Sequence, residues 1–410
     1  MGSSESTVRA YGFDVIEGKG VTRVSCKLDS QGFPENLFFD VTPSCLGQLA
    51  KMEPNWALVA LLYPAMFSGR DLVVEADISQ SLWHSAQGDL QGLMQASNAQ
   101  LRRIRIVSGL APIPQHRSPG VATGFSAGID SFTTLSLYMG DSVPESLRIT
   151  CLSVHNVGAF GRSRFARDAF SHACVRVERL ANSMGLGNVF IDSNIGDVFR
   201  ASIPQPRGFE RTHSFRNAAA AHVLHDKIGC FLYSSAFPFE QIGIDHMVRS
   251  SSKGPGYIDP ILLPLLSSER MRLLSAGAAL SRGQKTLLVS DNELAAKYLE
   301  VCVSPEGRLR YGKTNCSRCW KCERTMATLE AVGSLDRFEE VFDVQHYRAD
   351  REKIMKRLAR RVEQGSDTDA EILQMLTESG LRVPRLLPAH LIKARSIAGR
   401  VKRALLKPSS

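Results

Sequence analysis

The sequence lacks any apolar run long enough to cross a lipid bilayer, which needs about 20 residues. Its longest apolar stretch, WALVALLYPAMF at 56–67, is better explained as a buried helix. The first residues, MGSSESTVRAYGFD, lack the basic and apolar segments of a secretory signal. These absences argue against a membrane-spanning or secreted protein and predict a cytoplasmic one.

Internal repeats and long low-complexity tracts are absent as well. Hydrophobic residues make up 43% of the chain and charged residues 22%, which is ordinary for a globular protein. At about 150 residues per domain, the 410 residues predict two or three domains with at least one large core.

The formal net charge of +9 is concentrated at one end of the chain. Residues 346–410 hold 15 Lys and Arg against 7 Asp and Glu, which gives +8. Segment 389–406 also keeps apolar residues at roughly helical spacing. This basic C-terminal tail predicts contact with RNA or an acidic membrane surface, and the alternative is a solvated helix face.

Residues 1–112 resemble an α+β accessory module, in which strand-like segments such as NLFFDVT alternate with helical ones. No catalytic constellation is evident there, so we expect a scaffold, a lid or a dimerisation surface, with substrate recognition as the alternative. The segment LAPIPQHRSPG at 110–120 is rich in proline and polar residues and predicts a domain boundary.

From 113 to 335, β-rich apolar runs alternate with helical stretches. The runs are GVATGF, LRITCLSV, NVFIDS and CFLYSSAF, with a later strand expected at KTLLVS, 285–290. This alternation predicts βαβ units and a parallel sheet with helices on both faces, an α/β fold. After about Leu335 the sequence is helical and highly charged, so 336–410 is predicted to be a basic helical region.

Nine cysteines in a chain without a secretory signal argue against a disulfide framework. Cys316, Cys319 and Cys322 have the spacing C-x2-C-x2-C, which is typical of a zinc site. Cys302 is the nearest upstream thiol and the expected fourth ligand, with His346 as a weaker candidate. Four thiolates leave no open coordination position and predict a structural zinc. An iron-sulfur cluster is the alternative.

The stretch GFSAGIDSF at 124–132 lies between a predicted strand and a predicted helix. A small-residue loop at the start of a helix forms an anion site, because free amides and the positive end of the helix dipole face the same place. Neither GxxxxGK[ST] nor GxGxxG is present. The alternative is an ordinary tight turn in which Asp130 or Ser131 caps the helix.

Ser126-Ala-Gly-Ile-Asp-Ser131 resembles the SGGxDS signature of the PP-loop superfamily, the N-type ATP pyrophosphatases, with Ala127 replacing the first glycine. The resemblance implies that this loop holds the β- and γ-phosphates of ATP while a substrate oxygen attacks the α-phosphate. Ser126 and Ser131 would donate hydroxyl hydrogen bonds, and Asp130 would help to hold Mg²⁺. The nucleotide-binding set comprises Ser126, Ala127, Gly128, Ile129, Asp130, Ser131, Ser153 and Lys253.

A PP-loop followed by the cysteine cluster is similar to the 7-cyano-7-deazaguanine synthase branch of this superfamily. Weaker likenesses are Phe215-Arg216-Asn217 and the segment at 260–282, and the resemblance covers about 120–325. The gap between Cys302 and Cys316 is longer than in the synthase, and the N-terminal hundred residues and the tail are extra. The resemblance therefore implies a divergent relative, whose substrate is not inherited with the fold.

Five other residues are candidates for a role at the site. Arg216 is the candidate cation near nucleotide or substrate, with a salt bridge at the helix start as the alternative. Lys253 lies on an expected loop that could cover the phosphates, and a solvated lysine is the alternative. Asp245 and His246 form either an acid-base pair or a hydrogen-bonded structural pair. Ser153 is expected near the end of the second strand, where adenine meets the backbone in this fold.

The resemblance implies an ATP-dependent ligase that adenylates a carboxylate or amide oxygen of a small-molecule or modified-nucleobase substrate for attack by a nitrogen nucleophile. One alternative is a tRNA-modifying sulfur transferase, which needs a persulfide carrier among Cys151, Cys174 and Cys230. Another is a binding module for nucleotide or RNA that has lost turnover. The sequence leaves a homodimer open and does not name the acceptor.

Overall fold

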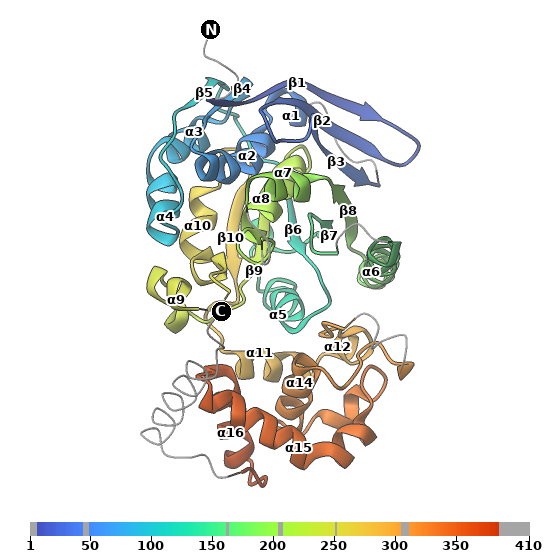
Figure 1. Cartoon of the computed structure of the whole chain (residues 1–410). Helices are drawn as coiled ribbons and strands as arrows, with labels where there is room; N and C mark the ends of the chain where they lie inside the picture. The colour runs from blue at the N-terminus through green and yellow to red at the C-terminus, as the bar shows by residue number, and fades with distance from the viewer. Residues whose placement is uncertain are drawn as a thin grey trace, which may run out of the picture. The chain divides into compact units, whose positions relative to one another are not determined.

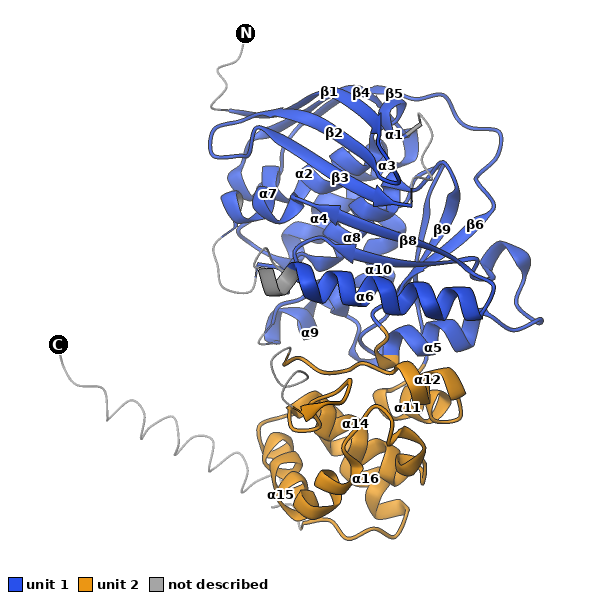
Figure 2. Cartoon of the chain, turned by 90° about the vertical axis from the view of Figure 1, so that its right-hand side faces the viewer, with its two compact units in different colours: residues 1–126, 130–279 blue, residues 127–129, 280–410 orange. Residues whose placement is uncertain are grey.

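The computed structural model describes residues 6–43, 49–160, 164–203, 208–250, 252–304 and 311–384 (Figure 1). They belong to two compact units (Figure 2). The first unit comprises the chain up to 126 together with 130–279, and the second comprises 127–129 together with the residues from 280 onward. The basic tail at 389–406, for which RNA contact is predicted, lies outside the described residues.

Ten strands of the first unit form one continuous sheet in the order β10-β9-β6-β7-β8-β3-β2-β1-β4-β5 (Figure 1). The run from β10 to β8 is parallel, as is the run from β1 to β5 through β4, and the pairs between β8 and β1 are antiparallel. The strands are β1 Thr7–Glu17, β2 Thr22–Asp29, β3 Asn36–Thr42, β4 Asp71–Ile78, β5 Ile106–Leu110, β6 Gly120–Gly124, β7 Cys151–Asn156, β8 Gly187–Ser193, β9 Ile228–Ser234 and β10 Arg272–Ala276. The prediction of an α/β fold with a largely parallel sheet is confirmed.

Helices cover this sheet. α6 packs on β7 and β8, and α10 packs on β10. α2 lies between β1 and β4 on one side and α7 and α8 on the other. Within the first unit the helices are α1 Leu49–Met52, α2 Asn55–Ser68, α3 Gln80–Gln87, α4 Asp89–Ser97, α5 Ile129–Tyr138, α6 Arg164–Ser183, α7 Ile195–Ser202, α8 His213–Val223, α9 Ile244–Arg249 and α10 Asp259–Leu265.

The longest apolar run forms α2, and every residue of this helix from Asn55 to Met66 is buried. A helix that is apolar all round needs partners on all sides, and α2 finds them in the sheet and in α7 and α8. The predicted buried helix is therefore confirmed. Among the described helices, none combines the length and the apolar character that a membrane crossing requires.

The junction between β3 and β8 joins the two halves of the sheet. Phe39 pairs with Ser193, and Asn194 extends the connection with its side chain. Its Oδ1 accepts the amide of Phe38 at 2.9 Å, and its Nδ2 donates to the carbonyl of Asn36 at 2.9 Å. Asn194 is 6% exposed. The predicted boundary near residue 112 therefore falls inside one compact unit, because the first five strands extend the same sheet.

The described part of the second unit is helical (Figure 2). Its helices are α11 Arg282–Ser290, α12 Glu293–Tyr298, α14 Trp320–Ala331, α15 Val344–Glu363 and α16 Asp367–Glu378. Compact packing changes at 279–280 rather than at the expected boundary of 335. The four cysteines of the expected zinc site consequently belong to the helical unit and not to the sheet.

The expected strand at 285–290 is wrong, because these residues belong to α11. A capping box fixes the helix start: the Ser281 hydroxyl accepts the amide of Gln284, whose side chain accepts the amide of Ser281. Gly283, Thr286 and Val289 are buried at helical spacing. The last strand of the sheet along the chain is instead β10, which lies within the segment at 260–282.

Replacement of Asn194 by alanine tests the junction between the two halves of the sheet. The substitution removes the hydrogen bonds of the Asn194 side chain to Phe38 and Asn36 and leaves the partly buried amide of Phe38 without its acceptor. We expect the free energy of unfolding to fall by about 2 kcal/mol in urea denaturation. The exposed Asn182 of α6 is the control, and Asn182→Ala should change stability by less than about 0.5 kcal/mol. Equal effects of the two substitutions would contradict this account.

Candidate functional site

The glycine loop lies at the topological switch point of the parallel sheet. β6 ends at Gly124 and α5 begins at Ile129, so the loop occupies the predicted strand-to-helix connection. β6 is flanked by β7 on one side and β9 on the other, with β8 and β10 beyond them. In open α/β sheets the crevice for ligands lies at the carboxyl ends of the strands, where successive connections leave in opposite directions. The loop stands at that position.

The loop has a conformation that glycine would adopt without strain. Ala127 has φ of 59°, in the left-handed region that costs an alanine roughly 1–2 kcal/mol. Strained backbone of this kind is concentrated at functional sites.

Two hydroxyls close the base of the loop. Ser131 Oγ accepts the amide of Ser126 at 3.1 Å, and the two hydroxyl oxygens are 2.9 Å apart. Ser131 thus bonds to the residue that opens the loop, five positions back, instead of capping α5. Ser126 is exposed and Asp130 is half-buried in the first turn of the helix. The Thr134 hydroxyl, which donates to the carbonyl of Asp130 at 3.0 Å, also lies 2.8 Å from Ser234 Oγ on β9.

Ser153 lies beside the loop, in the middle of β7 rather than near its end. It pairs with Gly124 across β6 and β7, and its carbonyl accepts the amide of Phe125 at 2.7 Å. The Ser153 hydroxyl donates to Nε2 of His155 at 2.5 Å, and Nδ1 of His155 donates to Asn217 Oδ1 at 3.1 Å. These roles follow because burial lowers the pKa of His155 to about 4 and keeps the ring neutral.

A second buried polar chain continues across the same edge of the sheet. Asn217 donates to the carbonyl of His213, whose Nδ1 lies 2.7 Å from the hydroxyl of Tyr233. Ser214 donates to Asp259 Oδ1 at 2.6 Å. Asp259 is fully buried and its Oδ2 has no hydrogen-bond partner within the described structure. Burial raises the pKa of Asp259 to about 7, and the hydrogen bond from Ser214 opposes that shift.

A pocket of about 400 Å³ opens where β7 and β8 end. Seven of its lining residues carry its chemistry: Phe38, Asn156, Arg167, Asp192, Arg200, Phe209 and Arg216. Asn156 Nδ2 donates to Asp192 Oδ1 at 2.7 Å, and the buried Asn156 Oδ1 has no partner within the described structure. Sequence reasoning missed this pocket apart from Arg216. The available signal was the polar residues that follow the buried strands β7 and β8.

Arg216 is the predicted cation that the structure places in this pocket. It is 3% exposed, its Nε donates to Thr212 Oγ1 at 2.9 Å, and its Nη1 donates to the carbonyl of Val157 at 3.2 Å. The guanidinium carbon lies 4.5 Å from the ring centre of Phe199. Burial, followed by the charge of Arg200, lowers the pKa of Arg216 to about 10. Both hydrogen-bond partners of Arg216 are neutral groups. These contacts therefore do not form the salt bridge at the helix start that was the alternative.

The other predicted candidates lie outside this cluster. Lys253 is exposed with φ of 51°, and its amide donates to Ser250 Oγ at 2.9 Å. Asp245 and His246 are both exposed on α9, and no described hydrogen bond joins their side chains. Asp245 lies 3.5 Å from Arg249 instead. Neither the acid-base pair nor the hydrogen-bonded pair expected at 245–246 is present in the described structure.

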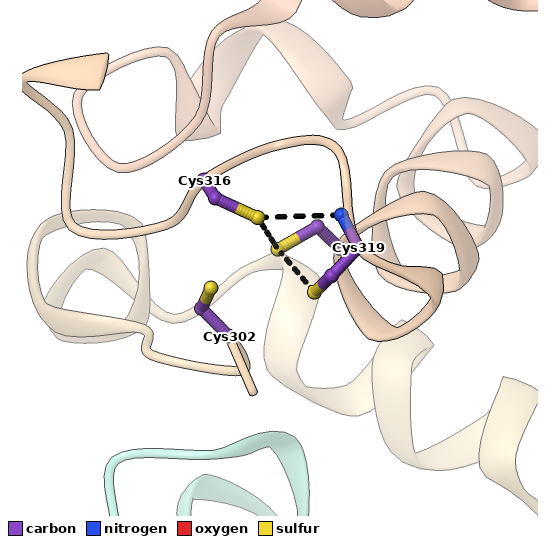
Figure 3. A group of neighbouring side chains, drawn as sticks. Cys302, Cys316 and Cys319 are labelled. Atoms are coloured by element: carbon purple, nitrogen blue, oxygen red, sulfur yellow. Dashed lines mark hydrogen bonds between the residues drawn. The ribbon is translucent and has the colours of Figure 1, made fainter. Parts of the chain in front are cut away.

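Four cysteine sulfurs meet in the second unit (Figure 3). The ligand atoms of Cys302, Cys316, Cys319 and Cys322 all lie within 4.8 Å of one another. Cys316 and Cys322 sulfurs are 3.9 Å apart, close to the roughly 3.8 Å between thiolates around a tetrahedral zinc with Zn–S bonds of about 2.3 Å. This group could hold a metal such as zinc. Neighbouring thiols, first Cys302 and then Cys322, lower the pKa of Cys319.

Backbone amides surround the sulfurs as they do in thiolate metal sites. The amide of Cys319 donates to Cys316 Sγ at 3.2 Å, and that of Ser304 donates to Cys302 Sγ at 3.4 Å. The buried Asn315 accepts the amides of Val301 and Cys302 at 2.8 and 3.1 Å and so fixes Cys302 beside the C-x2-C-x2-C segment. The predicted fourth ligand is Cys302, and His346 is not a member of the group.

Two of the candidate persulfide carriers are poor nucleophiles at neutral pH. Burial raises the pKa of Cys174 to about 12, and burial also raises the pKa of Cys230. A persulfide carrier needs an accessible thiolate, and neither of these two thiols offers one. The third candidate, Cys151, is half-buried, and its Sγ donates to the carbonyl of Leu152 at 3.6 Å. Cys45 lies outside the described residues.

The chain matches no family model, and no curated protein or solved structure is similar enough to it to count as a relative. Function is therefore argued from the residues of this chain.

Replacement of Cys316 by serine tests the metal site. We expect the wild-type protein, purified under reducing conditions and dialysed against zinc, to hold about one zinc per chain by elemental analysis. Cys316→Ser should hold essentially none and should unfold at a lower temperature, because a structural zinc contributes folding free energy. Cys174→Ser is the control and should keep its zinc. A wild-type protein without metal would contradict the zinc site, and a visible absorption band with bound iron would favour a cluster.

The buried carboxyl of Asp259 makes stability depend on pH. The pKa of Asp259 is raised to about 7 in the folded state, so the folded state binds its proton more tightly than the unfolded state does. This proton contributes fully to the free energy of unfolding below about pH 4, and the contribution is lost as the pH rises through 7. We expect Asp259→Asn to become progressively more stable relative to wild type between pH 4.5 and 7.5 in urea denaturation, by at most about 1.4 kcal/mol per pH unit. The exposed Asn182, which does not titrate, is the control, and the difference between Asn182→Ala and wild type should not vary with pH. A constant difference for Asp259→Asn would rule out the raised pKa.

Proposed function

We propose that this protein is an ATP-dependent synthetase of the N-type ATP pyrophosphatase kind. A carboxylate or amide oxygen of the acceptor attacks the α-phosphorus of ATP, the bond to the bridging oxygen breaks, and pyrophosphate leaves. A nitrogen nucleophile then attacks the activated carbon, loses a proton, and releases AMP. The site could equally follow the nitrile-forming course of the 7-cyano-7-deazaguanine synthases, in which a second activation of the same kind follows.

The observation that carries the proposal is the placement of SAGIDS. It joins the central strand of a parallel sheet to a helix at the switch point, with Ala127 in the left-handed conformation that the signature assigns to glycine. Loop amides and the N-terminal end of α5 favour an anion there. A six-residue match alone would be weak support, whereas the same six residues at the ligand crevice of this topology are stronger support.

Each residue of the loop has a role in this chemistry. The hydroxyls of Ser126 and Ser131, 2.9 Å apart, would donate to the β- and γ-phosphates. Asp130, in the first turn of α5, would hold Mg²⁺, a cation that takes a few carboxylate ligands and keeps several waters. The magnesium would neutralise charge on the departing pyrophosphate. The four-cysteine group would hold zinc with a structural role in the helical unit.

The sulfur-transfer alternative has less support, because burial keeps the described thiols of Cys174 and Cys230 protonated. A binding module without turnover shares the same loop, and turnover is what separates it from the synthetase. Its RNA contact would rely on the tail, which lies outside the described residues.

Product analysis of α-labelled ATP tests the proposal. With Mg²⁺ and fractions of small metabolites or RNA, we expect wild type to form AMP and pyrophosphate, and Asp130→Ala and Ser126→Ala to lower the rate at least 100-fold. Asp245→Ala, which changes an exposed carboxylate of α9, should keep the wild-type rate. ADP as the product would overturn the mechanism. ATP binding without AMP in any fraction would favour the binding module, and a required tRNA fraction with labelled sulfur in the product would favour the transferase.

A further inference from the structure

The pocket at the ends of β7 and β8 contains the buried cation Arg216, and the carboxylate of Asp192, which accepts from Asn156, lines the same pocket. The side chain of Arg216 is buried, with 3% of the residue exposed, and it donates hydrogen bonds to a hydroxyl and a carbonyl. No carboxylate of the described residues forms an ion pair with it. Burial of an unpaired charge costs several kcal/mol, so this arrangement favours a ligand that carries the missing negative charge.

A second arginine strengthens this demand. Arg200 on α7 lines the same pocket, and its charge acts on Arg216. Arg200 lies 3.3 Å from Asp197, and its side chain is 57% exposed, so the surface pair neutralises little of the buried charge. Arg167 also lines the pocket, and three guanidinium groups around one space suit a planar anion such as a carboxylate.

The pocket also contains a hydrogen-bond acceptor, Asn156 Oδ1, to which no group of the described structure donates. Asn156 is 8% exposed, and its Nδ2 is held by Asp192, which fixes the amide so that Oδ1 is the atom left over. Oδ1 is buried without a partner in the described structure, and an unsatisfied buried acceptor is unfavourable. A ligand with an N–H or O–H group at this point would satisfy it.

Aromatic rings line the same space and favour a flat ligand. Phe38 comes from β3, and Phe209 lies 5.4 Å from the guanidinium carbon of Arg216. Arg23 lies 4.2 Å from the centre of the Phe38 ring and fixes it, and Arg23 is itself paired with Asp40 at 2.7 Å. The volume of about 400 Å³ lies within the range of small-molecule sites.

We infer that this pocket binds the acceptor of the reaction as a flat carboxylic acid with a hydrogen-bond donor beside the acid group, its carboxylate on Arg216 and Arg200 and its donor on Asn156 Oδ1. The role as acceptor site rests on the proposed function. The N-terminal half of the sheet is then part of the site, because Phe38 belongs to β3.

Formate, the smallest carboxylate, is the first probe. In protein with ¹⁵N-labelled arginine, we expect the Nε–H signal of Arg216 to shift saturably with formate and not with neutral formamide. Arg216→Gln identifies the signal by its loss. Arg200→Gln, at an exposed position that tolerates change, should raise the half-saturating formate concentration several-fold, and Arg249→Gln on α9 should not. A shift that does not saturate, or that formamide reproduces, overturns the inference.

Pyrrole-2-carboxylate and furan-2-carboxylate test the donor. The two acids have the same shape and charge, but only the pyrrole carries an N–H group beside the carboxylate. We expect the pyrrole acid to bind several-fold more tightly in wild type and to lose this advantage in Asn156→Ala. Equal binding of the two acids in wild type would refute the assigned donor contact.

A competition experiment separates this inference from the proposed function. ATP with Mg²⁺ should leave the formate shift unchanged, and Asp130→Ala should keep the formate shift even though it abolishes AMP formation. If ATP displaces formate, the pocket receives phosphates of the nucleotide and the acceptor assignment is wrong. If formate saturates while no AMP forms in any fraction, the anion site stands and the proposed chemistry fails.

Discussion

The parallel pairing of β6 with both of its neighbours is the constraint on which the site depends. Because β7 and β9 flank it, the connection through α5 leaves to one side and the later return to β9 fills the other. The end of β6 is therefore left uncovered by its own connections. Loop amides, the start of α5 and the hydroxyls of Ser126 and Ser131 all gather at that point because of this one topological fact.

Behind the loop, the carboxyl edge of the sheet is unusually polar for a buried region. Ser153, His155 and Asn217 are linked by hydrogen bonds, and Tyr233 and Asp259 belong to the same layer. Satisfied networks of this kind rigidify a site, whereas each unsatisfied member costs free energy. The described structure leaves two acceptors of this edge unsatisfied, on Asn156 and Asp259. A buried cation and an acceptor without a donor in one pocket are unfavourable for the stability of the fold, which indicates that the pocket is built to bind a ligand.

Local features were predictable from the sequence, and long-range ones were not. The bounds of the glycine loop follow from small residues between an apolar run and a helical pattern, and the four-cysteine group follows from its spacing. KTLLVS was misassigned because most of its residues suit a strand; the signal that identifies the helix is Ser281 with Gln284 three residues later. The continuity of the sheet through β3 and β8, and the pocket made of Phe38, Asn156 and Arg216, depend on contacts between distant segments that no local pattern encodes.

That continuity also sets the order of events during synthesis. The hydroxyl of Ser193 donates to the carbonyl of Phe38, 155 positions earlier in the chain. At 5–20 residues per second, a ribosome needs roughly 8–30 s to make that length. During this interval the backbone of β3 that later pairs with β8 has no partner strand, and an unpaired strand edge is a template for association with other chains. The edge of β3 therefore stays unpaired until β8 has been made, and slower translation lengthens that interval.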